Sequence, residues 1–358
     1  MGKNLKCILL FLGIALLCNS CFTDKQKNDD AIEININPLF SIYDTVSQKV
    51  NFIMLDDKNG AELFSSISKM IVINKRIYIL DGNTSVIYIY NLNGDFLWKI
   101  DRVGQGPGEY IRLRDFNVQD NLLYVYDDIK RSLLCYDLND RQYVKTISTP
   151  FFARAFALLM NGDFLFVLPK DQGHKSIIIS DSLCNIKDEY IEYEKEDLDN
   201  RTRYSLLQET NLGITYSKPE CNNVYLFSKE DGKLLNIYTF LVDGDKYVKE
   251  IKQGPELCIT PLLMEDGKMI GNYKNGVNRY YFDVPLSQKE NSDVKEFTDK
   301  RNRVTDLLYP VCAIGDSVIG SYVLHEVYEN FNNSVPLSDK MEEYLDNGGF
   351  LIGLYSIK

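Results

Sequence analysis

The residues best suited to chemistry in this chain gather around one glycine-rich run, Gly104-Gln105-Gly106-Pro107-Gly108-Glu109-Tyr110. Two arginines follow the run, and a lysine lies in a predicted turn further along the chain. Guanidinium forks bind carboxylate and sulfate groups in a bidentate way, so this set favours an acidic ligand. The candidate ligand or partner contacts are Gln105, Glu109, Tyr110, Arg112, Arg114 and Lys130.

The same run also has a purely structural interpretation. Three glycines around a proline specify a tight loop. The spacing is not that of a dinucleotide-binding fingerprint, and no helix is predicted after it. Such a loop can simply turn the chain between two sheets, with Glu109 and Tyr110 anchoring the corner and the arginines paired with acids. The structural part of the motif is Gly104, Gly106, Pro107 and Gly108.

Signals for catalysis are sparse. The chain has two histidines, His174 and His325, and neither is paired with a nucleophile in a recognised pattern. A Gly-x-Ser-x-Gly nucleophile elbow is absent. Asp81 and Asp127 end equivalent predicted strands and would be the carboxylates of a metal site in a central channel, but repeated turn aspartates are typical backbone caps. We therefore predict no catalytic residue, no metal ligand and no cofactor.

Composition excludes some partners. The formal charge of −11 argues against nucleic acid, whose binding needs clustered Lys and Arg. The cysteines beyond Cys21 are scattered at wide spacing, unlike a disulfide framework or a zinc site. We expect them to be buried free thiols. They are Cys135, Cys184, Cys221, Cys258 and Cys312.

A repeat in the sequence indicates the elements that hold these residues. Tyr78-Ile79-Leu80-Asp81 and then Tyr90-Asn91-Leu92-Asn93 return, 46 residues later, as Tyr124-Val125-Tyr126-Asp127 and Tyr136-Asp137-Leu138-Asn139. Short alternating strands with a period of about 40–50 residues are typical of propeller blades, each a four-stranded sheet. The predicted fold is all-β, a six-bladed β-propeller of four-stranded antiparallel blades.

The first repeat predicts one blade strand by strand, from residues 67–74 at the axis through 76–81 and 86–91 to 96–100 at the outside. The second strand of a blade is traced six times, at residues 76–81, 122–127, 163–168, 223–228, 268–272 and 317–322. Charged residues 171–215 and 285–305 are predicted to be long loops. A short helix is predicted near residues 338–345, with Ser338 as its N-cap.

Two further expectations follow from this architecture. The loops at residues 82–85, 104–110 and 128–132 should cluster at one end of the ring, which makes that end the expected binding face. Residues 31–36 and 350–357 are both strand-like, so a segment from one end of the chain should complete a blade built from the other. Closure of this kind removes exposed sheet edges.

The first residues form an export signal. Lys3 and Lys6 precede an apolar run too short to span a bilayer, and Ser20 precedes Cys21 as a lipoprotein signal peptidase requires. Cys18 departs from the usual lipobox, and ordinary secretion with nearby cleavage is the alternative. We predict a signal peptide at residues 1–20, lipidation at Cys21, a tether at 21–30 and the propeller domain at 31–358. The expected location is the cell envelope, anchored through the lipid, in the outer membrane on either face.

The glycine run, together with Ile77-Tyr78-Ile79-Leu80-Asp81 and Tyr90-Asn91-Leu92-Asn93-Gly94, resembles a known family. It is similar to the six-bladed β-propeller lipoproteins of Gram-negative gut bacteria, which look related to NHL-repeat and TolB-like propellers. The likeness covers nearly the whole mature chain. It implies the architecture and export, with a binding role as an expectation, and it implies no agreed enzymatic activity.

Three functions remain open on the sequence alone. The first, which we expect, is a non-catalytic binding module for a glycan, a peptide or an envelope partner, presented by a rigid scaffold. The second is a metal-dependent hydrolase or lactonase-like propeller enzyme. The third is a component of an envelope complex that uses the propeller as a protein–protein platform.

Overall fold

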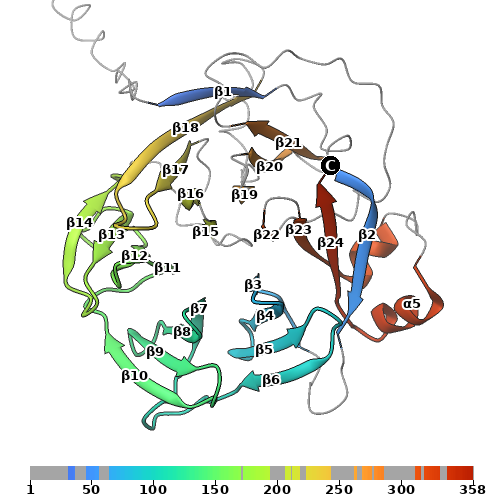
Figure 1. Cartoon of the computed structure of the whole chain (residues 1–358), viewed down its shortest axis with the longest axis horizontal. Helices are drawn as coiled ribbons and strands as arrows, with labels where there is room; N and C mark the ends of the chain where they lie inside the picture. The colour runs from blue at the N-terminus through green and yellow to red at the C-terminus, as the bar shows by residue number, and fades with distance from the viewer. Residues whose placement is uncertain are drawn as a thin grey trace, which may run out of the picture. The chain divides into compact units, whose positions relative to one another are not determined.

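Antiparallel hairpins of short strands make up nearly all of the structure. The computed structural model describes residues 31–36, 46–55, 64–170, 172–193, 206–210, 212–217, 223–242, 262–263, 268–275, 278–285, 311–315, 318–330 and 337–357. Residues Ile32–Lys358 form one unit. The strands described within it fall into six sheets around a common axis (Figure 1). The six-bladed propeller predicted from the repeat is therefore confirmed.

The first two blades follow the predicted repeat closely. Isoleucine, leucine and tyrosine dominate their middle strands, which are buried on both faces because each blade packs between two others. Blade 1 consists, from axis to outside, of β3 (Lys69–Ile73), β4 (Arg76–Asp81), β5 (Val86–Asn91) and β6 (Phe96–Ile100). Blade 2 consists of β7 (Leu113–Gln119), β8 (Leu122–Asp127), β9 (Ser132–Asp137) and β10 (Tyr143–Ser148).

The middle blades correct two predictions. Blade 3 consists of β11 (Ala155–Leu158), β12 (Phe164–Val167), β13 (Ile177–Ser180) and β14 (Ile186–Tyr190). Blade 4 consists of β15 (Leu207–Thr210), β16 (Gly213–Ser217), β17 (Asn223–Phe227) and β18 (Leu234–Val242), with β1 (Ile32–Ile36) at its outer edge. Residues 171–215 are thus not one long loop, and residues 223–228 contain the third strand of blade 4 rather than its second.

Both errors have one physical cause. The strands β13 and β15 each contain four residues, too few for a period of two to stand out among charged neighbours. Tertiary contacts make them strands: packing between blades buries every residue of β13, and β15 pairs with β16 and buries Leu207. The neighbouring strands supply the burial, and the local sequence does not show it.

The last two blades include segments from both ends of the chain. Blade 5 contains, among the described residues, β19 (Leu262–Leu263), β20 (Lys268–Asn275) and β21 (Asn278–Pro285). Blade 6 consists of β22 (Cys312–Ile314), β23 (Val318–Val323), β24 (Leu351–Ile357) and β2 (Val46–Met54). Their second strands, β20 and β23, lie where the spacing of the repeats predicted them.

The ring closes through pairing of the two ends, as expected, but with a different N-terminal strand. β2 runs antiparallel to β24, with Ile53 opposite Ile352. β1, which was the expected partner, instead pairs in parallel with β18, with Ile32 opposite Tyr238 (Figure 1). β2 contains nine residues and buries Ile53, and Leu55, which directly follows β2, is also buried. β2 therefore covers the last sheet more fully than the five-residue strand β1 could.

The core lies between neighbouring blades. Tyr110, Phe116 and Tyr136 pack with side chains of blade 1 in one cluster. Phe64 stacks on Phe350, with ring centroids 4.7 Å apart, where blade 1 meets blade 6. Large aromatic side chains at these boundaries supply much of the buried area that holds adjacent sheets together.

The described cysteines are free and buried, as predicted. They are Cys135, Cys184 and Cys312. Burial raises the pKa of each thiol, to about 12 for Cys184 and Cys312, which keeps them in the unreactive protonated form. The remaining cysteines predicted to be buried, Cys221 and Cys258, lie outside the described residues, and so does Cys21.

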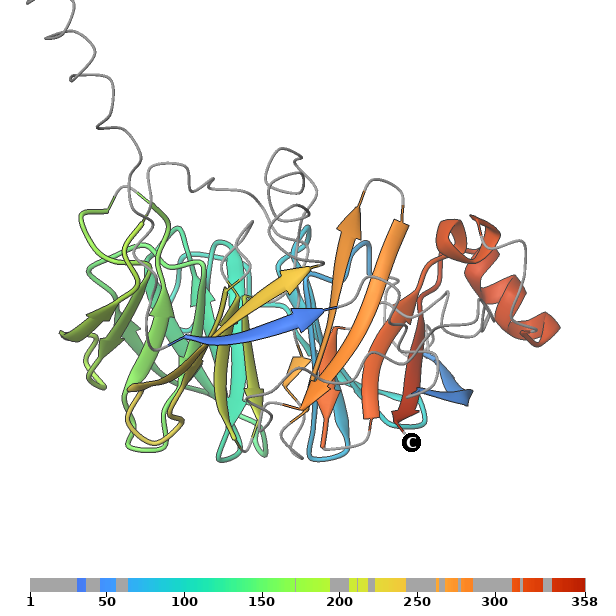
Figure 2. The same cartoon turned by 90° about the horizontal axis from the view of Figure 1, so that it is seen from above.

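Two helices, α4 (His325–Asn330) and α5 (Asp339–Asp346), lie beside blade 6 rather than in the ring (Figure 2). The predicted N-cap is confirmed: the Ser338 side chain accepts a hydrogen bond from the Met341 N–H. Leu345 of α5 packs with Val323 and Leu351 of the last blade. In the part of the chain that the structure describes, no helix has the length and apolar character needed to cross a membrane.

Candidate functional site

The glycine run forms the corner between β6 and β7. Tyr110 is fully buried there; its hydroxyl donates to the Ile100 carbonyl and accepts from the Arg102 N–H, each at 3.1 Å. This burial raises the pKa of Tyr110. The Glu109 carboxylate accepts the Gly106 N–H at 2.7 Å. Glu109 and Tyr110 therefore anchor the corner, as the structural interpretation of the motif predicted.

The corner also fits against the outer strands of blade 2. The Tyr136 hydroxyl donates to the Gly108 carbonyl at 2.9 Å, and the Arg102 guanidinium lies 5.7 Å from the centre of the Tyr136 ring. Gly108 has a φ of +71°, and a Cβ there would lie 2.6 Å from Cγ of Tyr143. Only glycine satisfies both the backbone conformation and this close approach.

Asp81 and Asp127 cap backbone at the same end of the ring. Asp127 accepts hydrogen bonds from the Ile111 N–H at 2.6 Å and the Ile129 N–H at 2.9 Å. Asp81 accepts from the Ser65 N–H at 2.8 Å. Burial by itself would raise the pKa of Asp81, but the hydrogen bonds it accepts outweigh that effect and lower the pKa. The capping interpretation of these two aspartates is confirmed.

The three predicted loops do meet at this end, which we call the mouth. The Ser85 hydroxyl accepts the Leu113 N–H at 3.2 Å, which joins the first loop to the start of β7. The Asp128 N–H donates to the Arg112 carbonyl at 3.3 Å, which joins the third loop to the residues that lead from the second loop into β7. The Lys130 ammonium donates to the Glu109 carbonyl at 2.8 Å. These cross-links make the mouth a rigid platform.

The sequence-predicted contacts differ in how far the fold already uses them. Arg112 makes two hydrogen bonds of 2.7 Å to the Asp128 carboxylate, which raise its pKa, although its side chain is 53% exposed. Gln105 and Arg114 are exposed. Glu109, Tyr110 and the half-buried Lys130 bind backbone groups, so Gln105, Arg112 and Arg114 are the members of the set that the mouth presents outward.

Sequence reasoning missed two exposed apolar residues in the mouth. Ile111 is 38% exposed and Ile129 is 49% exposed. Their amides bind the two oxygens of the one Asp127 carboxylate, so they lie on either side of it. A signal was present in the sequence, because Ile129 stands between charged residues in a predicted loop, and Ile111 stands between another predicted loop and Arg112.

Sequence reasoning also missed a polar cluster on the innermost strands. The Lys69 ammonium of β3 lies 2.8 Å from the Asp115 carboxylate and 3.2 Å from the Asn117 side-chain oxygen of β7, and all three residues are buried. Asp115 accepts the Phe156 N–H of β11 at 2.8 Å, while the Asn117 side-chain amide donates to the Phe156 carbonyl. The cluster thus connects three consecutive blades.

The composition of this cluster bears on the predicted alternative of a channel metal. Carboxylate and amide oxygens at the axis are the donors that such a site would need. Here one side-chain oxygen of Asp115 and that of Asn117 accept hydrogen bonds from the Lys69 ammonium. Glu209 of β15 is close enough to interact electrostatically with Lys69, and burial raises its pKa. No group of three or more metal-ligating side chains occurs among the described residues.

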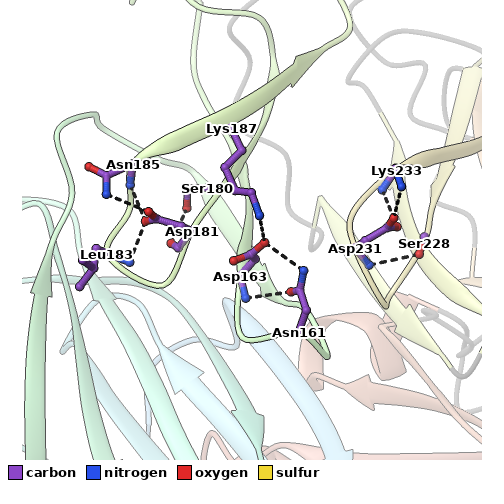
Figure 3. Close-up of polar contacts among 10 residues, drawn as sticks. All are labelled: Asn161, Asp163, Ser180, Asp181, Leu183, Asn185, Lys187, Ser228, Asp231 and Lys233. Carbon is purple, nitrogen blue, oxygen red and sulfur yellow. Dashed lines mark hydrogen bonds and ion pairs between the residues drawn. The ribbon is translucent and has the colours of Figure 1, made fainter.

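At the opposite end of the ring, turn side chains bind their own turn or a neighbouring strand of the same blade (Figure 3). Asp181 accepts the Leu183 and Asn185 N–H groups at 2.8 and 2.9 Å. Asp163 pairs with Lys187 at 2.6 Å. The Lys233 ammonium binds Asp231 at 2.6 Å and holds the pKa of that carboxyl at about 2. These polar groups stabilise hairpins of blades 3 and 4.

Comparison with known proteins agrees with this architecture. Residues 23–257 match the profile of a family described as 6-bladed beta-propeller. The chain belongs to this family. No curated protein matches the sequence.

Two solved structures from Bacteroides show the same fold. One is a protein of Bacteroides fragilis NCTC 9343 that carries the description of an exported protein; it is 16% identical, with a TM-score of 0.67, over 92% of this chain and 99% of that one. The other belongs to a family of unknown function in Bacteroides vulgatus; it is 10% identical, with a TM-score of 0.51, over 88% and 99% of the two chains. At these identities the likeness concerns the fold.

Proposed function

We propose that this protein is an exported, lipid-anchored and non-catalytic binding module whose working face is the mouth. One observation carries the proposal: the mouth exposes two apolar side chains, Ile111 and Ile129, next to charged side chains. Hydrogen bonds to Asp127 hold the backbone of both isoleucines in place. Apolar surface rimmed by polar groups on loops of a rigid scaffold is typical of interaction sites. The partner is a glycan, a peptide or an envelope protein.

The predicted contacts divide into two roles within this proposal. Gln105, Arg112 and Arg114 would contact the ligand or partner directly. Glu109, Tyr110 and Lys130 would act through the backbone of the corner, because their polar groups bind it. Loss of Tyr110 should therefore lower stability first and binding only as a consequence.

Binding by the mouth is tested with paired charge insertions at its two ends. The variant Ile111→Asp/Ile129→Asp adds two charges to the mouth, and Met160→Asp/Leu183→Asp adds two at the opposite end, where those side chains are 67% and 71% exposed. A glycan array and capture of envelope proteins on the purified mature chain should show binding by the wild type and by the second variant only. Equal binding by both variants would contradict the assignment of the face.

We further propose that Cys21 carries the lipid and that residues 22–30 form the tether. Two or three acyl chains give firm anchoring, where a single chain is marginal. The supports are the charged and apolar start of the chain and the Ser20-Cys21 junction. Cys21→Ala should move the protein from the outer-membrane fraction into a soluble one, while Cys18→Ala should leave it membrane-bound. Release of both variants, or of neither, would argue against the assignment.

A further inference from the structure

Exposed apolar side chains gather at the end of the ring opposite the mouth, on blades 3 and 4. The turns between first and second strands and between third and fourth strands lie at that end. The two most exposed large apolar side chains among the described residues, Leu183 at 71% and Met160 at 67%, are both in such turns of blade 3. Blade 4 adds two exposed leucines, Leu212 directly before β16 and Leu235 at the start of β18. We call these four side chains the apolar patch.

Contacts between the two blades make the patch part of one connected surface. The Met160 N–H donates to the Lys229 carbonyl at 2.9 Å, which joins a turn of blade 3 to a turn of blade 4. In that turn of blade 4, a Cβ on Gly232 would lie 2.6 Å from Cδ1 of Ile179 in blade 3. The turns that carry the patch are therefore held against one another.

Several charged groups around the patch are already paired. The Lys187 ammonium lies 2.6 Å from the Asp163 carboxylate, and the Lys233 ammonium lies 2.6 Å from that of Asp231 (Figure 3). Paired charges of this kind give little attraction to anionic groups. The patch therefore offers mainly apolar contact, which does not require an anionic partner.

The N-terminal strand joins the ring beside the patch. β1 begins with Ile32, which lies opposite Tyr238 of β18. Leu235 is three residues before Tyr238 on the same strand, a separation of about 10 Å. Cys21, which we propose above to carry the lipid, precedes Ile32 by eleven residues, and such a segment spans at most about 40 Å. A lipid at Cys21 would thus keep a membrane within reach of the patch.

We propose that the apolar patch rests on the surface of the membrane, so that the mouth, at the other end of the ring, faces away from it. Apolar side chains are stabilised at a lipid interface in proportion to the area that leaves water. The anchor makes this contact intramolecular in effect, so that even a weak surface interaction is populated. Side chains on four separate chain segments suit a flat and deformable surface. The inference rests on the proposed lipid anchor, and it adds the orientation of the ring.

Quenching of tryptophan fluorescence by brominated lipid tests the contact. The mature chain with an N-terminal hexahistidine tag is attached to vesicles of phosphatidylcholine with dibrominated acyl chains and a nickel-chelating lipid. Leu183→Trp places a tryptophan in the patch, and the matched control Ile129→Trp places one at the mouth. Trp98, the single tryptophan of the chain, is common to both variants. Relative to unbrominated vesicles, Leu183→Trp should lose fluorescence and Ile129→Trp should not.

Charge insertions in the Leu183→Trp background separate contact by the patch from mere nearness of the tether. Met160→Asp/Leu235→Asp should abolish the quenching, and Ile111→Asp/Ile129→Asp should leave it unchanged, with thermal scans to verify that both variants fold. The proposal is overturned by an absence of quenching, by equal quenching at positions 183 and 129, or by quenching that Met160→Asp/Leu235→Asp leaves intact. Light scattering without vesicles tests a different occupant: a dimer that Met160→Asp/Leu235→Asp dissociates would mean that the patch binds a second copy of the chain instead.

Separate measurements distinguish this inference from the lipid anchor on which it rests, because the tag attaches the chain to the vesicles whatever happens at Cys21. If Leu183→Trp is not quenched while Cys21→Ala is released from the cell membrane, the anchor stands and the docking surface is wrong. If Leu183→Trp is quenched while Cys21→Ala stays membrane-bound, the docking surface stands and the lipid assignment is wrong.

Discussion

Lys69 and Asp115 occupy the same repeat position in neighbouring blades, 46 residues apart, yet one is basic and the other acidic. Lys69 lies opposite Leu80 on the neighbouring strand, and Asp115 lies opposite Tyr126. Leu80 and Tyr126 each directly precede a capping aspartate. A repeat copied without change would place like charges there. The difference allows a buried ion pair to join the blades, and the equal offset was a signal that the sequence contained.

The first prediction concerns this ion pair. Lys69→Met leaves the Asp115 carboxylate buried without its cation, which typically destabilises a protein by about 3–5 kcal/mol. The matched control is Lys99→Met, which removes a half-exposed pair with Asp101 and should cost less than about 1 kcal/mol. Urea unfolding measures both. The double variant Lys69→Met/Asp115→Asn should recover much of the lost stability, since the amide oxygen at position 115 can still accept the Phe156 N–H. Equal stability of Lys69→Met and the wild type would show that the ion pair does not stabilise the ring.

The second prediction is a pH dependence at Asp81. Its folded-state pKa lies below the ordinary value of 3.8, so the unfolded state binds the proton more readily. The stabilisation is therefore complete above that value and is lost as the pH falls through the folded pKa. The gap in unfolding free energy between wild type and Asp81→Asn should be constant from about pH 5 to 7 and shrink below about pH 4. A gap independent of pH in urea titrations would show that the charge has no role.

At the scale of elements, the corner and the hairpin turns use glycine for different reasons. Gly108 and Gly162 both have positive φ, +71° and +85°. A Cβ at Gly108 would meet the Tyr143 ring, whereas a Cβ at Gly162 would meet nothing within 4 Å. The corner is thus constrained by packing between blades, and the turn only by its backbone.

This difference provides the third prediction. Gly162→Ala should cost about 1–2 kcal/mol, the penalty of a left-handed conformation. Gly108→Ala should cost a further 1–3 kcal/mol, roughly, because overpacking adds to that penalty. Thermal and urea unfolding of the two variants measure the difference directly. Equal losses would mean that the corner does not pack tightly against β10.

Two elements show where local sequence was insufficient. The hairpin of blade 1 was predictable to the residue, since β4, β5 and β6 are five or six residues long with clear turn signals. The strands β13 and β15 were not predictable, because four residues among charged neighbours carry too little periodicity. Their strand conformation depends on the sheets on either side.

At the scale of the whole molecule, the ring depends on pairing across almost the full length of the chain. β24 lies between β23 and β2, with hydrogen-bonded neighbours on both sides. β1 lies at an outer edge and has a neighbour on one side, β18. Loss of the two strands should therefore have unequal consequences.

The fourth prediction compares two truncations. Deletion of residues 350–358 removes β24, separates β2 from its sheet and exposes two strand edges, so the protein should become insoluble. A chain that starts at residue 37 lacks β1 but keeps four strands in blade 4, and it should stay soluble with a small decrease in melting temperature. Solubility and thermal scans check both. Unchanged melting after the C-terminal deletion would contradict closure by β24.

The sequence by itself determined the fold class, the blade repeat, the meeting of the mouth loops and the capping aspartates. These features depend on short-range patterns, namely alternation with a period of two, turn residues and one repeat offset, which a single chain displays in full. The functional candidates were predicted only in part. Gln105 and Arg114 are outward-facing, whereas Tyr110 is buried in the corner.

Tertiary structure decided which blade each chain end joins and which charged groups lie next to one another. β1 pairs with β18 rather than closing the ring, and Lys69 reaches across to Asp115 and Asn117. The start of β11 comes to lie against β7 only when blades 2 and 3 pack together. Such contacts join residues tens of positions apart, and their energies depend on burial, which exists only once neighbouring sheets have excluded water.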